Sequence, residues 1–543
     1  MDVKTTNSIG SAPEDLRIID MDSPLYHYAR VISNTRFGHM PKYIAYCEHA
    51  EHVQWCLTYC RDHGLDFRIR SGGHQHEGMC SGNGVMIIDL SKMDSIEYIG
   101  DEEAWIPVGK QLGKVYEELE ARSQIIPGGG CQSVNVGGLT QGGGWGLSIR
   151  KLGMTCDSIT ECEMVLASGE IVYPSHKELS DLFWAIKGSG GGNFGVITKF
   201  KFKLASLVPV MTSFALLWQK PDDVKLVLKR WAHLHANLDE LDPALSTACG
   251  MMVANPENVL LPDGHLSAVH SRMGGQFYGS KADLLDLLRK YFGSLIPDEK
   301  DFVQLAETRY EIPAGKRSKS DKEGASLLAH HQAKVADFIN PTSTMDHFDY
   351  KTSSCGDRGY KVLPEAPTST CDRPHPHKVT SGFPKAKNNQ EHDTLIDSIY
   401  EYLGRTCYYS DVSQYMSFHC LGGAVTQHPE SRVFAFYEKP YMLQIQCWWD
   451  DAGNAFTNET RNKVYVKWVE DFRKHLLPQI EGAFINFIDQ SLVDDPHTPE
   501  GRLELLAIYY GEKHLNTLRV LKARYDEGNF FNFEMSIPPW PPL

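Results

Sequence analysis

The sequence predicts strands and helices of the α+β or α/β class, with a separate second domain in the middle of the chain. Short apolar runs alternate with an amphipathic stretch between residues 43 and 90. From about 206 to 495 the pattern changes to longer amphipathic stretches mixed with apolar strands. A chain of 543 residues is long enough for roughly two to four domains.

The first part of the chain is expected to begin with a strand, a helix and two further strands, followed by a mixed region. Periodicity and turn residues give, in chain order, a strand at 43–47, a helix at 51–65, strands at 66–70 and 85–90, a helix at 115–122, two strands within 153–175 joined by Ala-Ser-Gly-Glu, and a helix at 178–187.

The middle region is expected to form helices at 222–238, 281–292 and 393–404 and strands within 431–449. Residues 350–392 are rich in Pro, Ser, Lys, Asp and His and show little periodicity. This composition predicts a long exposed loop or insertion.

Composition excludes some classes of partner. The formal charge of −15 argues against nucleic acid or an anionic membrane, because both favour basic surfaces. The N-terminal residues lack the apolar stretch of about 7–15 residues of a signal peptide, so a cytoplasmic location is expected. No run reaches the roughly 18 apolar residues of a membrane span. Most of the thirteen cysteines are expected to be reduced, buried and inert.

Two loops carry the strongest signals. Residues 70–76 (RSGGHQH) place two histidines directly after a predicted strand. Residues 127–146 contain nine glycines in twenty positions, interleaved with apolar residues that a flexible linker would not need. Glycine allows the backbone to approach a ligand closely and offers bare N–H groups, which indicates a large anionic cofactor.

A third glycine cluster, at 187–202, has Gly190, Gly192 and Gly195 in the spacing of a dinucleotide-binding fingerprint. That fingerprint requires a strand before the glycines and a helix after them. Here the predicted order is reversed, so the match to Rossmann-type binding is interpreted as false.

Together these motifs resemble a known family. RSGGH, GGGCQSVNVGGLTQGGGWG, DLFWAIKGSGGGNFGVITKF and the C-terminal YYGEKHLNTLRVLKARYDEGNFFNFEMSIPP are similar, in order and spacing, to the berberine bridge enzyme-like group of the vanillyl-alcohol oxidase flavoproteins. The group includes hexose and oligosaccharide oxidases, hydroxynicotine oxidase and antibiotic-tailoring oxidases. The resemblance extends from about residue 38 to residue 539.

The resemblance implies an α+β fold and a bicovalently bound FAD. His74 matches the histidine bonded to the flavin 8α-methyl group, and Cys131 matches the cysteine bonded to flavin C6. A two-subdomain FAD-binding domain of the PCMH type is implied for residues 1–205, completed by a C-terminal segment at 495–543. A substrate domain with a large antiparallel sheet and flanking helices is implied for 206–494.

The glycine backbone and its neighbours are expected to hold the cofactor. Besides His74 and Cys131, the expected contacts are Arg70, Ser71, Gly72, Gly73, Gly128, Gly129, Gly130, Val134, Gly137, Gly138, Gly142, Gly143, Gly144, Gly195, Val196 and Asn529. Asn135 and Leu139 depart from the Gly and His that are commoner in this loop. In relatives, a small residue at the position of Val134 leaves room for dioxygen.

The usual catalytic base of the family cannot be carried over. Phe484 and Phe487 occupy the positions of the family's phenols, and Gln446 occupies that of its glutamate. Neither phenyl nor amide is a useful base. His76 lies where relatives have a tyrosine facing the substrate, and an imidazole titrates near neutrality, so His76 is the predicted base and Gln446 a predicted substrate or flavin contact.

Other residues carry weaker signals. Trp448 and Trp449 are adjacent on one strand, so at most one of them can face a cavity and stack on a sugar. Four tyrosines of the middle region are alternative phenols, namely Tyr409, Tyr415, Tyr437 and Tyr441. Cys355, Cys371, His375 and His377 lack the close cysteine pair of a structural zinc site, so no metal is expected.

Three functional hypotheses follow. The favoured one is an FAD-dependent oxidase that acts on an alcohol of a sugar, oligosaccharide or secondary metabolite and reduces O2 to hydrogen peroxide. The second is an amine or phenol oxidase or dehydrogenase of the same family. The third is a flavin-binding protein that has lost catalysis, an alternative raised by the missing phenols.

Overall fold

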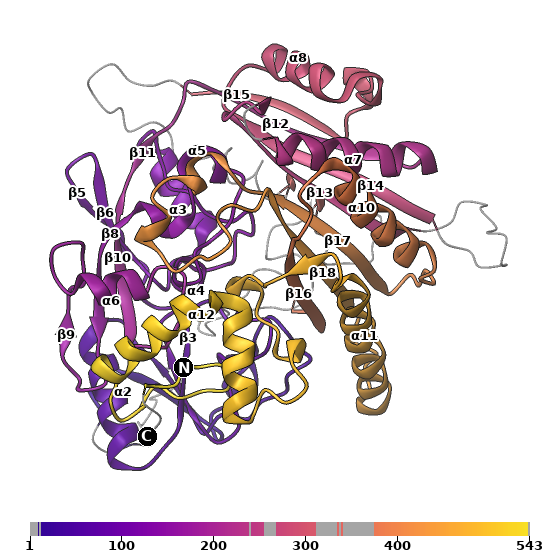
Figure 1. Cartoon of the computed structure of the whole chain (residues 1–543). Coiled ribbons are helices and arrows are strands. Elements are labelled where there is room, and N and C mark those ends of the chain that lie inside the picture. The colour runs from indigo at the N-terminus through magenta and orange to yellow at the C-terminus, as the bar shows by residue number, and fades with distance from the viewer. Residues whose placement is uncertain are drawn as a thin grey trace.

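Three large β-sheets organise the chain, and Figure 1 shows the helices that cover them. The structure is a computed structural model that describes residues 9, 12–237, 240–254, 268–310, 334–335, 338–339 and 374–540. The fold is α+β, as the sequence predicted.

The first sheet has four strands in the order β1-β2-β4-β3. β2, β3 and β4 are parallel, and β1 is antiparallel to β2. The central strands β2 and β4 are mostly apolar, as expected for strands covered on both faces, whereas β1 and β3 carry charged residues. The elements are β1 (Arg17–Asp20), α1 (Tyr26–Ala29), β2 (Tyr43–Tyr46), α2 (Ala50–Asp62), β3 (Phe67–Arg70) and β4 (Met86–Asp89).

The second sheet is antiparallel, with the order β5-β6-β10-β8-β9. Strands β7 and β11 form a separate antiparallel pair. The elements are β5 (Glu97–Ile99), β6 (Glu103–Pro107), α3 (Leu112–Glu120), β7 (Gln124–Ile125), α4 (Val136–Gln141), α5 (Ile149–Leu152), β8 (Ile159–Val165), β9 (Ile171–Val172), α6 (Ser180–Ala185), β10 (Val196–Lys203) and β11 (Ala205–Ser206).

The third sheet has eight antiparallel strands in the order β15-β12-β14-β13-β17-β18-β16-β19. Helices α7 and α10 pack on β13 and β14, α8 on β12 and β15, and α11 on β16 and β18 (Figure 1). The elements are β12 (Val210–Trp218), α7 (Pro221–Ala236), β13 (Leu245–Ala254), β14 (Ala268–Phe277), α8 (Lys281–Phe292), β15 (Gln304–Arg309), β16 (His377–Pro384), α10 (Asn389–Gly404), β17 (Val412–Cys420), β18 (Tyr441–Trp449), α11 (Ala455–Leu476) and β19 (Ile480–Glu481).

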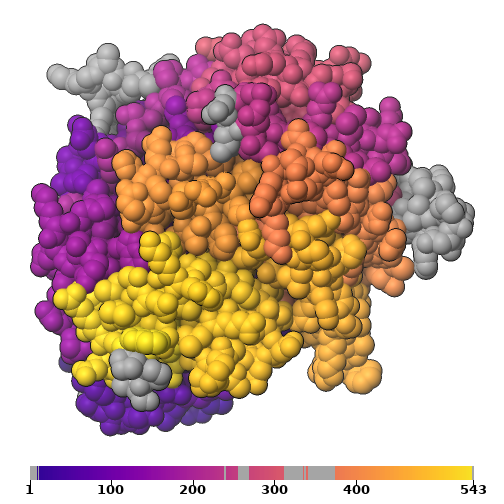
Figure 2. Space-filling view, in the orientation of Figure 1, coloured from indigo at the N-terminus to yellow at the C-terminus, as the bar shows by residue number. Residues whose placement is uncertain are grey.

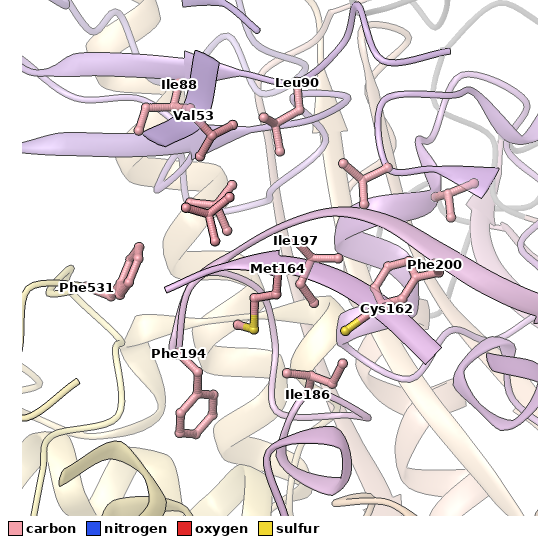
Figure 3. Close-up of a cluster of buried hydrophobic side chains, with 14 of the residues drawn as sticks. Val53, Ile88, Leu90, Cys162, Met164, Ile186, Phe194, Ile197, Phe200 and Phe531 are labelled. Atoms are coloured by element: carbon pink, nitrogen blue, oxygen red, sulfur yellow. The ribbon is translucent and has the colours of Figure 1, made fainter. Parts of the chain in front are cut away.

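The last helix, α12 (Pro499–Tyr525), returns the chain to the first two sheets. Leu505, Leu518 and Phe531 belong to the same buried cluster as Val53 and residues of β4, β8 and β10. Figure 3 shows Phe531 among these side chains, and in Figure 2 the C-terminal residues adjoin the indigo N-terminal part. One hydrophobic core is therefore built from both ends of the chain. The domain boundaries near 205 and 495 remain predictions.

The predicted elements of the first part are present within a few residues of their expected ends. The prediction for 350–392 was wrong where the structure describes it. Residues 377–384 form β16, buried along its whole length, and α10 begins at Asn389. The polar side chains suggested exposure, but Lys378 and His377 find polar partners inside the protein. Residues 350–373 lie outside the described residues. Of the predicted strand region at 431–449, only β18 is a strand.

Within the described part of the chain, no helix combines the length and apolar character needed to cross a membrane.

The shared core predicts how α12 contributes to stability. Leu518 is fully buried, and Val520 on the same helix is 55% exposed. We expect Leu518→Ala to lower the free energy of unfolding by about 2–5 kcal/mol through lost burial and a residual cavity. The control Val520→Ala should change it by less than about 0.5 kcal/mol. Denaturant titration compares the two, and equal midpoints would show that α12 is not part of the core.

Candidate active site

A cavity of about 410 Å³ lies between the loops of the first two sheets and one face of the eight-stranded sheet. Its volume is in the range of small-molecule sites, roughly 300–1,000 Å³. Most lining residues come from separate segments of the sequence: 67–80, 129–147, 189–197, 444–448, 484–488 and 531–535. The remaining contacts include Ala248, Val335 and Ile339.

One wall of the cavity is mostly glycine backbone. A Cβ at Gly137 would lie 2.9 Å from Cβ of Val108, and a Cβ at Gly72 would lie 2.8 Å from the Asn135 amide oxygen. Gly73 and Gly192 have φ of 72° and 78°, values that other residues rarely adopt. The glycines that line the wall are Gly72, Gly73, Gly129, Gly130, Gly137, Gly138, Gly142, Gly190, Gly191, Gly192 and Gly195.

This wall has unused hydrogen-bonding groups. Within the residues that the structure describes, the amides of Gly72, Gly73, Gly191 and Gly192 have no acceptor. The Ser189 hydroxyl is also buried without a partner. Clusters of free backbone N–H groups bind phosphate oxygens, so the wall fits the diphosphate of a dinucleotide.

His74 and Cys131 line the same cavity although 57 residues separate them in sequence. The two loops are in contact, because the Ser133 hydroxyl lies 3.1 Å from Nε2 of His74. The Leu112 amide donates to the Val134 carbonyl at 2.8 Å, which fixes the second loop on the start of α3. Cys131 is exposed, and among the described cysteines only Cys407 is also exposed.

The structure brings most of the predicted cofactor contacts together. Those that line the cavity are Ser71, Gly72, Gly73, His74, Gly129, Gly130, Cys131, Val134, Gly137, Gly138, Gly142, Gly195 and Val196. Five others lie behind the wall: Arg70, Gly128, Gly143, Gly144 and Asn529.

The five residues behind the wall have structural contacts. The Arg70 guanidinium is buried, pairs with Asp89 of the adjacent strand and donates to the Ala29 carbonyl. Gly128 packs against the Tyr116 hydroxyl, and Gly143 and Gly144, with φ of 106° and 82°, form a turn. Asn529 has φ of 49° and precedes the lining residues 531–533.

The loop at 189–192 was missed by the sequence reasoning. It follows α6 and precedes β10, the reverse of the Rossmann order, so rejecting that motif was sound. The loop nevertheless forms part of the glycine wall. Its glycine content was the available signal, but only the packing of α6 and β10 shows which way it faces.

The opposite wall comes from β17 and β18. Gln444, Gln446 and Trp448 alternate along β18 and line the cavity. Leu443, Ile445, Cys447 and Trp449 point into the core between the sheet and its helices. His419 of β17 and the rings of Phe484 and Phe487 complete this wall. Of the adjacent pair Trp448 and Trp449, Trp448 therefore faces the cavity.

Gln446 is held firmly by its neighbours. Its amide oxygen accepts hydrogen bonds from the Tyr415 hydroxyl and Trp448 Nε1, both at 3.0 Å, and its amide nitrogen lies 3.3 Å from the Ser417 hydroxyl. Burial raises the pKa of Tyr415 well above its usual range. None of the four tyrosines considered from the sequence lines the described cavity, so they are poor candidates for the base.

His76 lies at the junction of the two walls. It lines the cavity, and its Nδ1 is 3.0 Å from Nε2 of His377. Its ring centre is 6.0 Å from that of Phe487. Burial, together with the charges of His74 and Lys378, lowers the pKa of His76 to about 3. The expectation that this imidazole titrates near neutrality was wrong, because the protein excludes the water that would stabilise its charge.

A buried ion network lies behind His76. Lys378 Nζ is 2.7 Å from Glu77 and 2.5 Å from Asp489, and Arg36 is 3.4 Å from Glu77. Burial alone would raise the pKa of Asp489, but Lys378 lowers it to about 2. The sequence gave no sign of this network, because its members are far apart in the chain and Lys378 was expected in a loop.

Comparison with known families agrees with this geometry. Residues 41–173 match the family model described as FAD binding domain, and residues 483–538 match that described as Berberine and berberine like. The chain is an FAD-linked oxidoreductase that contains both domains typical of berberine bridge enzyme-like proteins. The two matched regions contain both covalent-attachment candidates and the two phenylalanines of the opposite wall.

Relatives of this oxidoreductase cover nearly its full length. The uncharacterized FAD-linked oxidoreductase YgaK of Bacillus subtilis (strain 168) is 27% identical over 534 residues, which cover 96% of this chain and 97% of the relative. Physcomitrella patens BBE-like 1 has a TM-score of 0.73 at 23% identity, covering 96% and 97% of the two chains. Chitooligosaccharide oxidase has a TM-score of 0.72 at 20% identity, with the same coverage. The two structures show that the fold is shared.

One cluster among the described residues has metal-ligand spacing, formed by Asp15, His49 and His52, none of which lines the cavity. The Glu48 amide donates to Nδ1 of His52 at 3.3 Å, so Nε2 of His52 carries the hydrogen and faces Asp15 at 3.1 Å. Nδ1 of His52 is thus occupied by the backbone, and His49 also pairs with Glu51 at 2.8 Å. Of the four residues weighed for zinc, Cys355 and Cys371 lie outside the described residues.

The ion network predicts an acid-sensitive contribution to stability. Replacing Lys378 by Met leaves the buried Asp489 without its ammonium partner and leaves Glu77 with Arg36 at 3.4 Å, and we expect a loss of about 3–5 kcal/mol at pH 7. The folded-state pKa of Asp489 is below its unfolded value of about 3.9. In the unmodified protein its contribution is therefore complete above pH 4 and is lost toward pH 2.

The stability of the Lys378→Met variant should respond to pH in the opposite direction. It should rise as the pH falls, since protonation removes the buried negative charge that has lost its ammonium partner. The stability difference between the two proteins is expected to shrink as the pH falls from 7 to 4, measured by denaturant titration. Lys467→Met removes an exposed pair with Asp471 and is the control, with no expected change in midpoint. A pH-independent difference would contradict the electrostatic interpretation.

Proposed function

We propose that this oxidoreductase oxidises an uncharged alcohol, such as a sugar or a hydroxylated secondary metabolite, with FAD attached through His74 and Cys131. The observation that supports this best is the imidazole of His76 in a cavity whose described lining has one charged side chain, Arg68, which is paired with Glu534. Dioxygen would reoxidise the cofactor and give hydrogen peroxide. The bound FAD supplies the acceptor for the hydride.

The proposed reaction balances without another co-reactant. The carbinol carbon loses hydride, that is, one hydrogen with both bonding electrons, and the hydroxyl loses its proton. The C–O single bond becomes a carbonyl. Dioxygen takes up the two electrons and two protons as hydrogen peroxide. The protein must therefore orient the carbinol hydrogen toward the cofactor and provide an acceptor for the hydroxyl proton.

His76 can accept this proton although its pKa is low. The neutral form carries a lone pair, and at physiological pH this is the form present. An alcohol becomes strongly acidic as hydride leaves its carbon, because positive charge develops on the carbonyl group. A weak base that removes the proton in the same step is then sufficient.

The polar groups of the wall favour hydroxyl substrates over amines. Among the described residues that line the cavity, Arg68 is the only one with a formal charge at neutral pH, and it pairs with Glu534 at 3.0 Å. An ammonium group entering the cavity would lose hydration without a carboxylate partner. Gln444 and His419, joined by a hydrogen bond of 2.9 Å, and the Trp448 ring suit hydroxyls and the apolar face of a ring.

Phenol oxidation remains the second candidate, supported by the aromatic groups Phe487 and Trp448 on the same wall. The small side chain of Val134, which lines the cavity, supports the oxidase over a dehydrogenase because it leaves space for dioxygen. A protein without catalysis would have no need for an acceptor nitrogen on this wall.

Covalent attachment has a direct test. After acid precipitation, the flavin absorbance should stay with the polypeptide in the unmodified protein and in the single variants His74→Ala and Cys131→Ala. It should move to the supernatant in the double variant, which has neither bond. Cys407→Ala removes the other exposed thiol and is the control. Colour released from the unmodified protein would contradict both attachments.

Flavin bleaching without oxygen tests substrate class and base. Neutral sugars, oligosaccharides and hydroxylated aromatics are expected to bleach the holoenzyme, and matched amines are not. His76→Ala should slow bleaching by about 10²–10⁴-fold, the usual contribution of a positioned base, while the flavin stays attached. On admission of oxygen, hydrogen peroxide should form in proportion to substrate.

If amines bleach the flavin and alcohols do not, the proposed substrate class of uncharged alcohols is wrong and the substrate is an amine. Near-normal bleaching of His76→Ala by an alcohol would exclude His76 as the base. Absence of bleaching by any compound, together with absence of peroxide, would favour the non-catalytic alternative.

A further inference from the structure

A chain of hydrogen bonds extends from His76 away from the cavity. Nδ1 of His76 lies 3.0 Å from Nε2 of His377, and Nδ1 of His377 lies 2.9 Å from the carbonyl oxygen of His375. The two rings meet edge to face, with centres 5.1 Å apart. His377 begins β16, a strand that no sequence pattern had assigned to the site.

The carbonyl group of His375, at the end of this series of hydrogen bonds, determines which nitrogen of each imidazole carries a hydrogen. A carbonyl oxygen can only accept, so Nδ1 of His377 carries a hydrogen. In a neutral imidazole the other nitrogen is then an acceptor, so Nε2 of His377 must receive the hydrogen of His76 Nδ1. Nε2 of His76, for which the described residues offer no partner, is left with a free lone pair.

Both rings are neutral, as this assignment requires. Burial lowers the pKa of His377 well below its ordinary value, and the neighbouring charges of His76 and Arg36 act in the same direction. The other charges near the pair are the ammonium of Lys378 and the carboxylates of Glu77 and Asp489, which compensate one another through the ion network.

The backbone on both sides holds the pair in place. Asn34 donates through its amide nitrogen to the carbonyls of His76, at 2.6 Å, and His377, at 3.0 Å. Its amide oxygen accepts from the His377 amide at 3.1 Å. Trp448 stacks on the His377 ring with centres 3.9 Å apart and an interplanar angle of 27°. Few other orientations are open to His377.

We propose that His377 is a positioning residue that holds His76 in the tautomer whose Nε2 lone pair faces the substrate hydroxyl. This rests on the proposed function. When the hydroxyl proton moves to Nε2 of His76 and hydride leaves the carbon, the Nδ1–H of the imidazolium already has an acceptor in His377. Without that acceptor, His76 is free to place its hydrogen on Nε2, where it would block proton removal.

The test compares two substitutions of His377 in the holoenzyme by anaerobic flavin bleaching with an alcohol substrate. His377→Phe keeps a flat ring against Trp448 but removes the acceptor, and bleaching should slow by about 10²-fold with little change in substrate affinity. His377→Gln restores an acceptor oxygen and should recover the rate to within about tenfold of the unmodified enzyme. His392→Phe is the control and should leave the bleaching rate unchanged. This buried histidine forms a hydrogen bond with Tyr441 in the core on the helix side of the sheet and does not line the cavity.

A double-mutant cycle separates positioning from structural damage. In the His76→Ala background, His377→Phe should change the bleaching rate by less than about twofold, because no base is left to orient. An equal slowing in both backgrounds, or a failure of His377→Gln to recover the rate, would overturn the role of His377. A normal rate for His377→Phe beside a slow His76→Ala would overturn it while leaving the proposed base intact.

Discussion

The buried ammonium group of Lys378 joins three distant parts of the chain, and the geometry of the site depends on it. Glu77 lies in the loop between β3 and β4 of the first sheet, Lys378 belongs to the eight-stranded sheet, and Asp489 precedes the returning helix α12. All three side chains are at least nine-tenths buried. A buried charge without a counter-charge costs several kcal/mol, so these segments are stable only when they meet. Their meeting fixes His76 and His377, the immediate sequence neighbours of Glu77 and Lys378.

The two walls of the cavity present different chemical groups. On one side, glycines expose backbone amides, which suit a large phosphate-bearing molecule and leave no side chains in its way. On the other side, strands β17 and β18 present neutral amides, an imidazole and aromatic rings. Because strand residues alternate, the same β18 that supplies Gln444, Gln446 and Trp448 also fills the core beneath the helices. Binding and chemistry are thus supported by different elements.

Burial determines what each ionisable group near the cavity can do. It raises the pKa of the Tyr415 phenol and lowers that of the His76 imidazole, which is the neutral state that the proposed base requires. Phe484 and Phe487, which the resemblance matches to the family's phenols, line this cavity and carry no ionisable group. The imidazole and its hydrogen-bonded partner offer a lone pair where the phenols are missing.

The sequence determined the features that depend on local pattern. The elements of the first part, the two glycine loops, and the pairing of His74 with Cys131 in recognisable motifs could all be predicted, because strand periodicity and glycine runs are short-range signals. The tertiary structure decided the rest. Residues 377–384 look like a loop in sequence because they are polar, and they form a buried strand only because Glu77, Asp489 and His76 satisfy them. Such long-range compensation leaves no local trace, since each partner lies more than 100 residues away.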